Sequence, residues 1–213
     1  MKKQHVDINR KLAIRRQLLK LLPIPKGRAA YVPFIGDADI AATLYQDFNV
    51  WGADLDADRL AIADSRLVNA VLRRHNCDLW PFEHDNPPPF HVGDFDAYGY
   101  PYDSFRAFWR NAPKADRVAL FFTDGQQAIL RGGRFRLPTG EKAEATRKEK
   151  GRYANLWWSR HIFPWFRDEM EREGWTIVRT RHYTRLASML YWGAVVRRSA
   201  SDGAEPEPVD GFE

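Results

Sequence analysis

The segment Tyr31–Asp39 reads YVPFIGDAD, and the segment Val50–Asp56 reads VWGADLD. Each begins with apolar residues that suit a buried strand and ends in a turn with a small residue or an acid. The residues between them include IAATLYQDF, which has helical spacing. This order of strand, helix and strand predicts a βαβ unit, the beginning of a parallel sheet with helices on its faces.

The same patterns predict further strands and helices in alternation along the chain. We expect the other strands at 78–84, 89–96, 116–124, 175–185 and 187–198, and the other helices at 6–22, 57–75, 102–111 and 153–174. The helix at 57–75 is indicated by residues spaced three or four apart, namely Leu60, Ala63, Leu67, Ala70, Val71 and Arg74. The last two strands are close enough in sequence to form a hairpin.

Two stretches depart from this alternation. Residues 132–151 are polar and carry many charges, which predicts a mobile loop or insertion. Within the helix expected at 153–174, Pro164 lacks a backbone donor, so the helix kinks or begins there. Gly174 is placed to end that helix, because glycine adopts the left-handed conformation of a helix terminus.

The composition favours one globular α/β domain, since the chain has 213 residues, 44% of them hydrophobic. No stretch approaches the roughly 20 apolar residues of a membrane span, and the basic N-terminus lacks the apolar core of a secretory signal. We therefore expect a cytoplasmic protein that does not bind membranes, with Cys77 outside any disulfide and the oligomeric state open. The spacing of His75, Cys77 and His84 matches no standard zinc pattern, so we expect no metal site.

The net charge of +5 is unevenly distributed. The last fifteen residues hold five acids and no base, so the other 198 residues hold 33 bases against 23 acids, a net charge of +10. Such an excess makes nucleic acid a reasonable partner, and ordinary solubility is the alternative explanation. We divide the chain into a basic N-terminal helix within 1–27, a domain at 28–198 and a disordered acidic tail at 199–213. The helix would pack through its apolar stripe, with charged residues on its remaining surface, namely Lys11, Arg15, Arg16 and Lys20.

The ends of the first two strands are suited to a nucleoside cofactor. Such a cofactor needs a small residue where the backbone approaches it, here Gly36, and an acid that accepts the ribose hydroxyls, here Asp54. Asp54 could instead cap the following helix, although Asp56 directly precedes that helix. The neighbouring residues that we also expect at the cofactor are Phe34, Asp37 and Leu55. A dinucleotide is disfavoured, because its pyrophosphate needs several glycines and would be repelled by acids in the first turn.

A second group of candidate residues follows the strand at 89–96. Transfer of a methyl group to an exocyclic amine needs acceptors that orient the nitrogen and a flat surface that holds the base. The carboxylate of Asp96 and the carbonyl of Ala97 could accept the amine hydrogens, and Tyr98 could stack on the ring. The alternative is an ordinary turn in which Tyr98 is only a wall residue.

The segment Asp94–Pro101, DFDAYGYP, resembles the D-x-D-P-[FY]-G-x-P segment of the tRNA guanine-N2 dimethyltransferases, with Ala97 where that family has proline. Likewise, Phe122-Thr123-Asp124 resembles the T-D at the end of the next strand in that family. The resemblance extends loosely over Tyr31 to Gly132, about half of the chain. It implies S-adenosylmethionine as cofactor, with Asp54 at the ribose, Asp85 near the adenine and Asp94 beside the cofactor. It also implies that Asp96, Ala97 and Tyr98 are the catalytic and base-holding residues.

The resemblance further implies a Rossmann-like class I methyltransferase fold. Its sheet would be mostly parallel and seven-stranded, in the order 3-2-1-4-5-7-6, with an antiparallel last strand and helices on both faces. The expected acceptor is a nucleobase nitrogen in nucleic acid, RNA ahead of DNA, with phosphates bound by Arg131, Arg134, Arg136, Arg147, Lys148 and Lys150. A small-molecule methyltransferase and a noncatalytic nucleic-acid-binding module are the alternatives.

Overall fold

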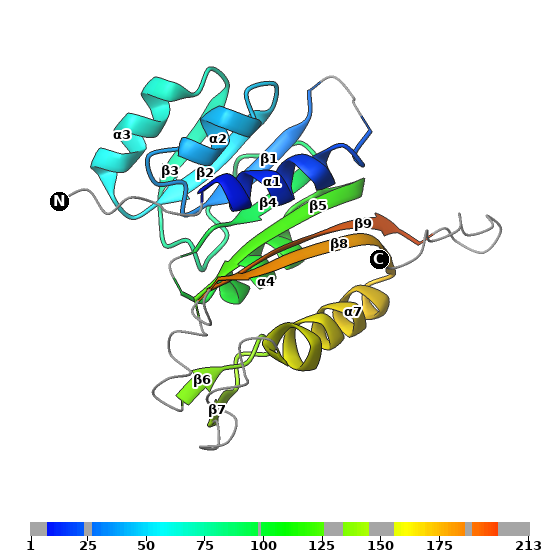
Figure 1. Cartoon of the computed structure of the whole chain (residues 1–213). Helices are drawn as coiled ribbons and strands as arrows, with labels where there is room; N and C mark the ends of the chain where they lie inside the picture. Colours follow the sequence, from blue (N-terminus) through cyan, green and yellow to red (C-terminus); the bar gives the residue numbers. More distant parts are fainter. Residues whose placement is uncertain are drawn as a thin grey trace.

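A computed structural model describes residues 8–23, 27–97, 99–125, 134–144, 156–185 and 189–199. Seven strands form one sheet in the order β3-β2-β1-β4-β5-β9-β8 (Figure 1). Their bounds are β1 Ala29–Pro33, β2 Asn49–Asp54, β3 Ala70–Arg74, β4 Phe90–Phe95, β5 Lys114–Asp124, β8 Trp175–Arg185 and β9 Met189–Arg198. The first five strands are parallel, whereas β9 is antiparallel to both β5 and β8. The expected fold class and strand order are confirmed.

Helices cover both faces of this sheet (Figure 1). Residues of α1 (Ile8–Leu19), α2 (Asp39–Leu44) and α3 (Ala57–Arg66) share one buried cluster with one face of the strands. Residues of α4 (Tyr102–Asn111) and α7 (Phe163–Arg172) belong to a second cluster on the other face. The second cluster is rich in aromatic rings, and Phe122 stacks on Trp192 with centroids 3.9 Å apart. None of the described helices combines the length and apolar character needed to cross a membrane.

The expected helix at 57–75 is wrong in its second half. The helix ends at Arg66, Leu67 has an extended backbone, and Ala70–Arg74 forms β3 beside β2. The strand predicted at 78–84 is also wrong, because that segment is a series of turns. A short apolar run such as Ala70–Leu72 suits a helix and a buried strand equally well by periodicity, and pairing with β2 decides between them.

The polar segment at 132–151 contains secondary structure that its composition did not predict. Arg134–Arg136 (β6) and Lys142–Glu144 (β7) form a two-stranded antiparallel hairpin. Phe135 is 5% exposed and packs edge-on against Trp157, which anchors the hairpin to the domain. Residues 132–133 and 145–151 of that segment lie outside the described residues.

The last helix follows the prediction around Pro164. A single π-helical turn, Trp158–Ile162, precedes α7, and Pro164 lies in the first turn of α7, where its missing N–H is tolerated. Gly174 follows the helix with φ of +75°, and its N–H donates to the carbonyl of Glu171. Both expectations for this helix are confirmed.

Candidate cofactor and acceptor site

The carboxyl ends of β1 and β2 are joined through Asp54. Its Oδ2 accepts a hydrogen bond from the N–H of Gly36 at 3.0 Å, and its Oδ1 accepts one from the N–H of Asp56 at 3.0 Å. Asp56 caps α3, since its side chain accepts from the N–H groups of Asp58 and Arg59. The cap is therefore Asp56, as the sequence favoured, and Asp54 remains available at the edge of the sheet.

The turn after β1 has an unusual backbone. Phe34, Gly36 and Ala38 have φ values of 59°, 52° and 60°. Left-handed conformations are uncommon for Phe and Ala and cluster at functional sites. The turn lies where the strand order reverses, because β1 has β2 on one side and β4 on the other. Open α/β sheets bind ligands in the crevice at such a point.

Two exposed apolar side chains lie at the same edge of the sheet. Leu55 directly follows β2 and is 62% exposed, and Leu79 follows β3 and is 54% exposed. They are two of the four large apolar side chains that are exposed among the described residues. Exposed apolar side chains at the ends of neighbouring strands offer a surface for a flat, poorly hydrated ring.

The acids around these leucines differ in their surroundings. Asp37 is exposed, whereas Asp85 pairs with Arg73 of β3 at 2.7 Å. Because β3 ends at Arg74, Asp78 is the first acid after it. The third strand was predicted at 78–84, so Asp78 was not recognised as an acid that follows a strand. Desolvation raises the pKa of Asp78, and the charge of Asp103 adds to the rise. Asp78 therefore joins Asp85 as a candidate for the adenine side of the crevice.

Asp94, in β4, is fully buried and bonded within the protein. Its carboxylate pairs with Arg15 of α1, through Nε to Oδ2 at 2.7 Å and Nη2 to Oδ1 at 2.6 Å. The hydroxyl of Tyr45 donates to Oδ2 at 2.7 Å. The prediction that Arg15 lies on the surface of the N-terminal helix is wrong, because it is 2% exposed. A buried carboxylate requires such a partner, and this one fixes α1 against β4.

Asp96, just beyond β4, is also paired with α1. Its Oδ1 accepts from Lys11 at 2.6 Å. Burial alone would raise the pKa of Asp96, but the charges of Lys11 and Arg15 outweigh burial and hold the pKa below its usual value. Asp96 is therefore an ionised acceptor, next to Ala97, which is 4% exposed. Tyr98 lies outside the described residues.

The end of β5 forms the other wall of this region. Asp124 is fully buried, and its Oδ2 accepts from the hydroxyl of Tyr102 at 2.8 Å and from Nε1 of Trp157 at 2.9 Å. The N–H of Gly125 donates to the carbonyl of Gly99 at 2.8 Å, which ties the loops after β4 and β5 together. Trp157 is thus a core residue.

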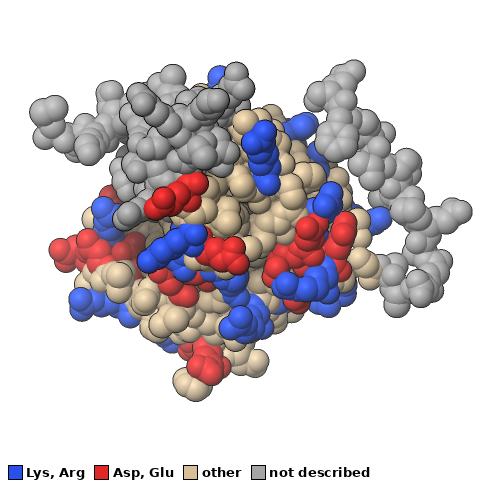
Figure 2. Space-filling view, turned by 90° about the horizontal axis from the view of Figure 1, so that it is seen from below, with Lys and Arg blue, Asp and Glu red and all other residues tan. Residues whose placement is uncertain are grey.

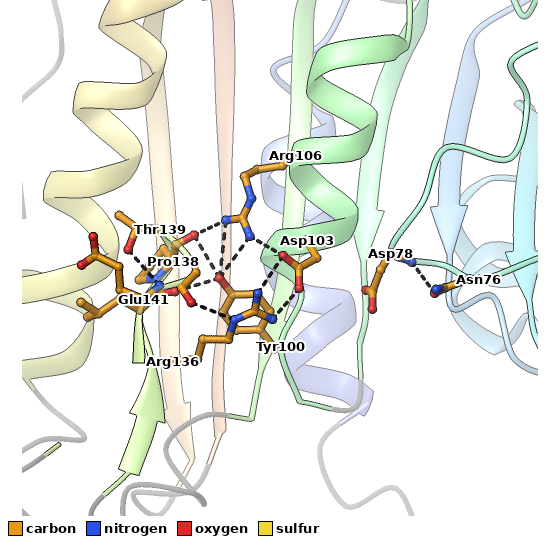
Figure 3. A network of polar contacts seen from close by, with 11 residues as sticks. Asn76, Asp78, Tyr100, Asp103, Arg106, Arg136, Pro138, Thr139 and Glu141 are labelled. Atoms are coloured by element: carbon orange, nitrogen blue, oxygen red, sulfur yellow. Dashed lines mark hydrogen bonds and ion pairs between the residues drawn. The ribbon is translucent and has the colours of Figure 1, made fainter. Parts of the chain in front are cut away.

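The hairpin docks on the start of α4 through a network of polar contacts (Figure 3). Arg136 reaches Asp103 from the hairpin, with Nη1 to Oδ2 at 2.5 Å, and Arg106 also pairs with Asp103. The hydroxyl of Tyr100 donates to the carbonyl of Leu137 at 2.8 Å. Figure 3 shows Asp78 on the other side of Asp103 from the hairpin.

The structure describes only some of the six cations predicted to bind phosphate. Arg136 pairs with Asp103, a carboxylate that it shares with Arg106. Arg134 lies in β6, and the other four, Arg131, Arg147, Lys148 and Lys150, lie outside the described residues. On the face seen from below, acidic and basic side chains are intermixed (Figure 2). No group of three His, Cys, Asp or Glu side chains suited to a metal occurs in the described parts of the chain.

Solved structures share this fold. The plantazolicin methyltransferase BamL, in complex with a triazolic desmethylPZN analog and SAH, has a TM-score of 0.57 at 11% identity, over 92% of this chain and 88% of that chain. An rRNA methylase from Streptococcus thermophilus has a TM-score of 0.54 at 10% identity, over 93% and 99%. An S-adenosylmethionine-dependent methyltransferase from Mesorhizobium loti has a TM-score of 0.52 at 15% identity, over 86% and 96%.

The chain thus has the Rossmann-like fold of class I S-adenosylmethionine-dependent methyltransferases. No family model matches its sequence, and no curated protein matches it. The resemblance of Asp94–Pro101 to the tRNA guanine-N2 dimethyltransferases accordingly gains no support from the comparisons.

Proposed function

We propose that this protein is an S-adenosylmethionine-dependent methyltransferase that acts on a nucleobase nitrogen. The observation that carries the proposal is the position of Asp54, an acid at the end of β2 that is bonded to the N–H of Gly36 at the reversal of the strand order. A carboxylate there can accept both hydroxyls of a ribose, while the glycine lets the cofactor approach the backbone.

The chemistry of the crevice fits this cofactor. Asp37 is exposed in the turn after β1 and would repel a pyrophosphate, whereas it attracts a cationic sulfonium and ammonium. The nearby Asp39 is also exposed but is paired with Arg66 at 2.6 Å. Leu55 and Leu79 would border the adenine, with Asp78 or Asp85 accepting its amine hydrogens. When bound, S-adenosylmethionine supplies a methyl group on a positively charged sulfur, which is already an activated donor. Positioning of the acceptor is then the main task of the protein.

Asp96 and Ala97 would orient the acceptor. The carboxylate of Asp96 is held in its ionised form by Lys11, so it can accept a hydrogen bond from an exocyclic amine but cannot donate one. The carbonyl of Ala97 would accept the second hydrogen, and Tyr98 would stack on the base. This arrangement aims the nitrogen lone pair at the methyl group, and it favours amines over hydroxyl acceptors with a single hydrogen.

The excess of basic residues supports a nucleic-acid acceptor, with RNA ahead of DNA. A small-molecule acceptor is the second candidate, and the pairing of Arg136 with Asp103 favours it, since that cation is not available for phosphate. Salt separates the two, because phosphate contacts make acceptor binding strongly dependent on ionic strength.

Calorimetry with S-adenosylmethionine and S-adenosylhomocysteine tests the cofactor. We expect both to bind, and Asp54→Ala to weaken binding by about 10- to 100-fold, because it removes hydrogen bonds to a charged acceptor. Asp56→Ala is the matched control, since it removes a neighbouring acid that only caps α3. If neither ligand binds the wild-type protein, the proposal of a methyltransferase activity is refuted.

Transfer of a labelled methyl group to tRNA, rRNA, DNA and metabolite pools tests the acceptor. Asp96→Ala should abolish transfer while cofactor binding stays intact. Full activity of Asp96→Ala would remove Asp96 from its proposed role, and labelling confined to metabolites would replace the nucleobase with a small molecule.

A further inference from the structure

The edge of the sheet formed by β9 and β8, together with α1, contains no acidic residue. Four bases occur in α1, three in β8 and two in β9, which makes nine basic residues and no Asp or Glu in these three elements. This differs from the face in Figure 2, where both signs of charge are intermixed. A one-signed surface of this kind attracts ions of the opposite charge.

Some of these bases are used within the protein and others are not. Lys11 and Arg15 pair with Asp96 and Asp94. By contrast, Arg10, Arg179 and Arg181 have no acidic partner among the residues that the structure describes. We call these three residues the arginine lane.

Strand register places the arginine lane on one face of the sheet. Arg181 lies opposite Gly193, and a Cβ at Gly193 would meet Leu18 of α1 at 2.9 Å. Arg179 lies opposite Val195, which belongs to the same buried cluster as α1. Directly opposite residues share a face, so both arginines point to the side that α1 covers. They are about 6.7 Å apart along the strand, which lets each contact a different phosphate.

Aromatic rings lie at the end of the arginine lane that is nearer to Asp96. The guanidinium of Arg10 lies 5.2 Å from the centroid of Tyr183, which stacks on Tyr191. Lys11 lies 5.2 Å from the centroid of Tyr191 and bonds to Asp96. The lane therefore begins beside the carboxylate that we assign to the acceptor. β8 is the outermost strand of its sheet, Arg179 is half-buried and Arg181 is exposed.

Further basic residues lie beyond the other end of the arginine lane. Arg117 of β5 and Arg197 of β9 are directly opposite each other, an arrangement that destabilises a sheet unless other interactions offset it. Both line an open hollow of about 970 Å³, together with Lys114 and Arg198. Asp116 is the one acid among the residues that line it, and it pairs with Arg198 at 3.7 Å. A lane that leads from the acceptor carboxylate to this hollow has the charge and extent suited to an extended polyanion.

We propose that the arginine lane binds the phosphate backbone of a nucleic-acid strand and so directs one of its bases to the edge near Asp96. This inference rests on the proposed nucleobase acceptor for its biological role. The surface lies on α1 and β8 and includes none of the six cations assigned to phosphate from the sequence. Charge complementarity is the basis for naming nucleic acid as the occupant.

Binding of a fluorescent single-stranded RNA oligonucleotide of mixed sequence, without cofactor, tests the lane. We expect Arg179→Ala/Arg181→Ala to lose affinity on the order of tenfold, and to reduce the slope of log K against log salt by about 0.7 for each contact removed. The matched control is Arg167→Ala/Arg172→Ala, which removes two exposed arginines from α7 and should leave the slope unchanged. Arg179→Lys/Arg181→Lys should retain most of the slope.

Thermal unfolding and cofactor calorimetry on the same variants separate the possible failures. Intact cofactor binding with lost RNA affinity supports the lane, whereas an absence of cofactor binding in the wild type overturns the enzyme activity alone. An unchanged salt slope in the double alanine variant would overturn the proposal that the arginine lane binds phosphates. The role left for Arg179 and Arg181 would be to prevent edge-to-edge pairing of β8 with another strand. Equal binding to anionic phospholipid vesicles would assign the surface to membranes and overturn the proposal as well.

Discussion

Arg15 and Asp94 form a two-point ion pair between the first helix and the fourth strand, with contacts of 2.7 and 2.6 Å and side chains that are 2% and 1% exposed. The charge of Asp94 outweighs the burial of Arg15 and raises the pKa of the guanidinium. Removal of one partner leaves the other charged and buried.

Arg15→Ala should therefore lower the free energy of unfolding by about 3–5 kcal/mol. Urea denaturation measures this change. In Arg15→Met/Asp94→Leu both charges are gone, so stability should recover by several kcal/mol relative to Arg15→Ala. A double variant no more stable than the single one would contradict the account of Asp94 as a charge that needs this partner.

The pair Lys11–Asp96 should make stability depend on pH. Because the pKa of Asp96 is lowered in the folded state, its stabilisation is complete above the unfolded value of about 3.9 and is lost as the pH falls through the folded pKa. Lys11→Met should cost about 1–3 kcal/mol at neutral pH. Urea denaturation at a series of pH values should show that this difference shrinks in acid, and a pH-independent difference would count against the ion pair.

The hairpin should loosen when Asp103 loses its charge. Asp103→Asn weakens the contact to Arg136 that docks the hairpin on α4, and also the contact to Arg106 within α4. We expect faster tryptic cleavage after Arg136, with global stability lowered by about 1 kcal/mol. Asp168→Asn is the control, because its partner Arg167 belongs to α7 and does not touch the hairpin. Equal cleavage rates in the two variants would show that other contacts hold the hairpin.

Cys77 should react slowly with thiol reagents in the folded protein. Burial raises the pKa of its thiol to about 11, and its Sγ donates to the carbonyl of Ala53 at 3.6 Å. The thiolate is the reactive form, so little of it is present near neutral pH. Colorimetric titration with a disulfide reagent should proceed quickly only in denaturant. A rapid reaction of the native protein would mean that the segment after β3 opens readily.

Gly193→Ala should push α1 away from the sheet. A Cβ there would lie 2.7 Å from Cδ1 of Phe121 and 2.9 Å from Cδ1 of Leu18 and from the carbonyl oxygen of Leu120. Overpacking of this kind costs about 1–3 kcal/mol in a denaturation experiment. In the double variant with Leu18→Ala, the second change makes room, so the two effects should be less than additive. Strict additivity would contradict the contact with α1.

Sequence predicted the parts of the fold that have one strong local signal. The apolar run ending in Thr123-Asp124 became β5, and the residues 102–111 became α4 with the expected bounds. Residues 70–74 were assigned to a helix, because the pairing of Ala70, Val71 and Leu72 with β2 is a long-range interaction that periodicity does not contain. The hairpin was missed because each of its strands has only three residues, although Pro138 and Gly140 mark its turn.

The candidate site was predicted unevenly for a similar reason. Gly36 and Asp54, both expected at the cofactor, are joined by a hydrogen bond after β1 and at the end of β2, and their role in cofactor binding stays a prediction. The bond between Arg15 and Asp94 joins residues 79 positions apart, and nothing local distinguishes Arg15 from the exposed Arg16 beside it. Asp78 was missed because its role depends on where β3 ends. Sequence spacing identified the edge of the sheet, and long-range packing determines which charges face it.

The position of α1 has a consequence for the order in which parts of the chain can fold. This helix packs on β9, which enters the sheet between β5 and β8, so its binding surface is complete only when the last strand has been made. During synthesis the first helix must wait for residues near the other end of the chain. The helix carries the cations that pair with Asp94 and Asp96, so β9 helps to hold those cations at the edge on which the proposed chemistry depends.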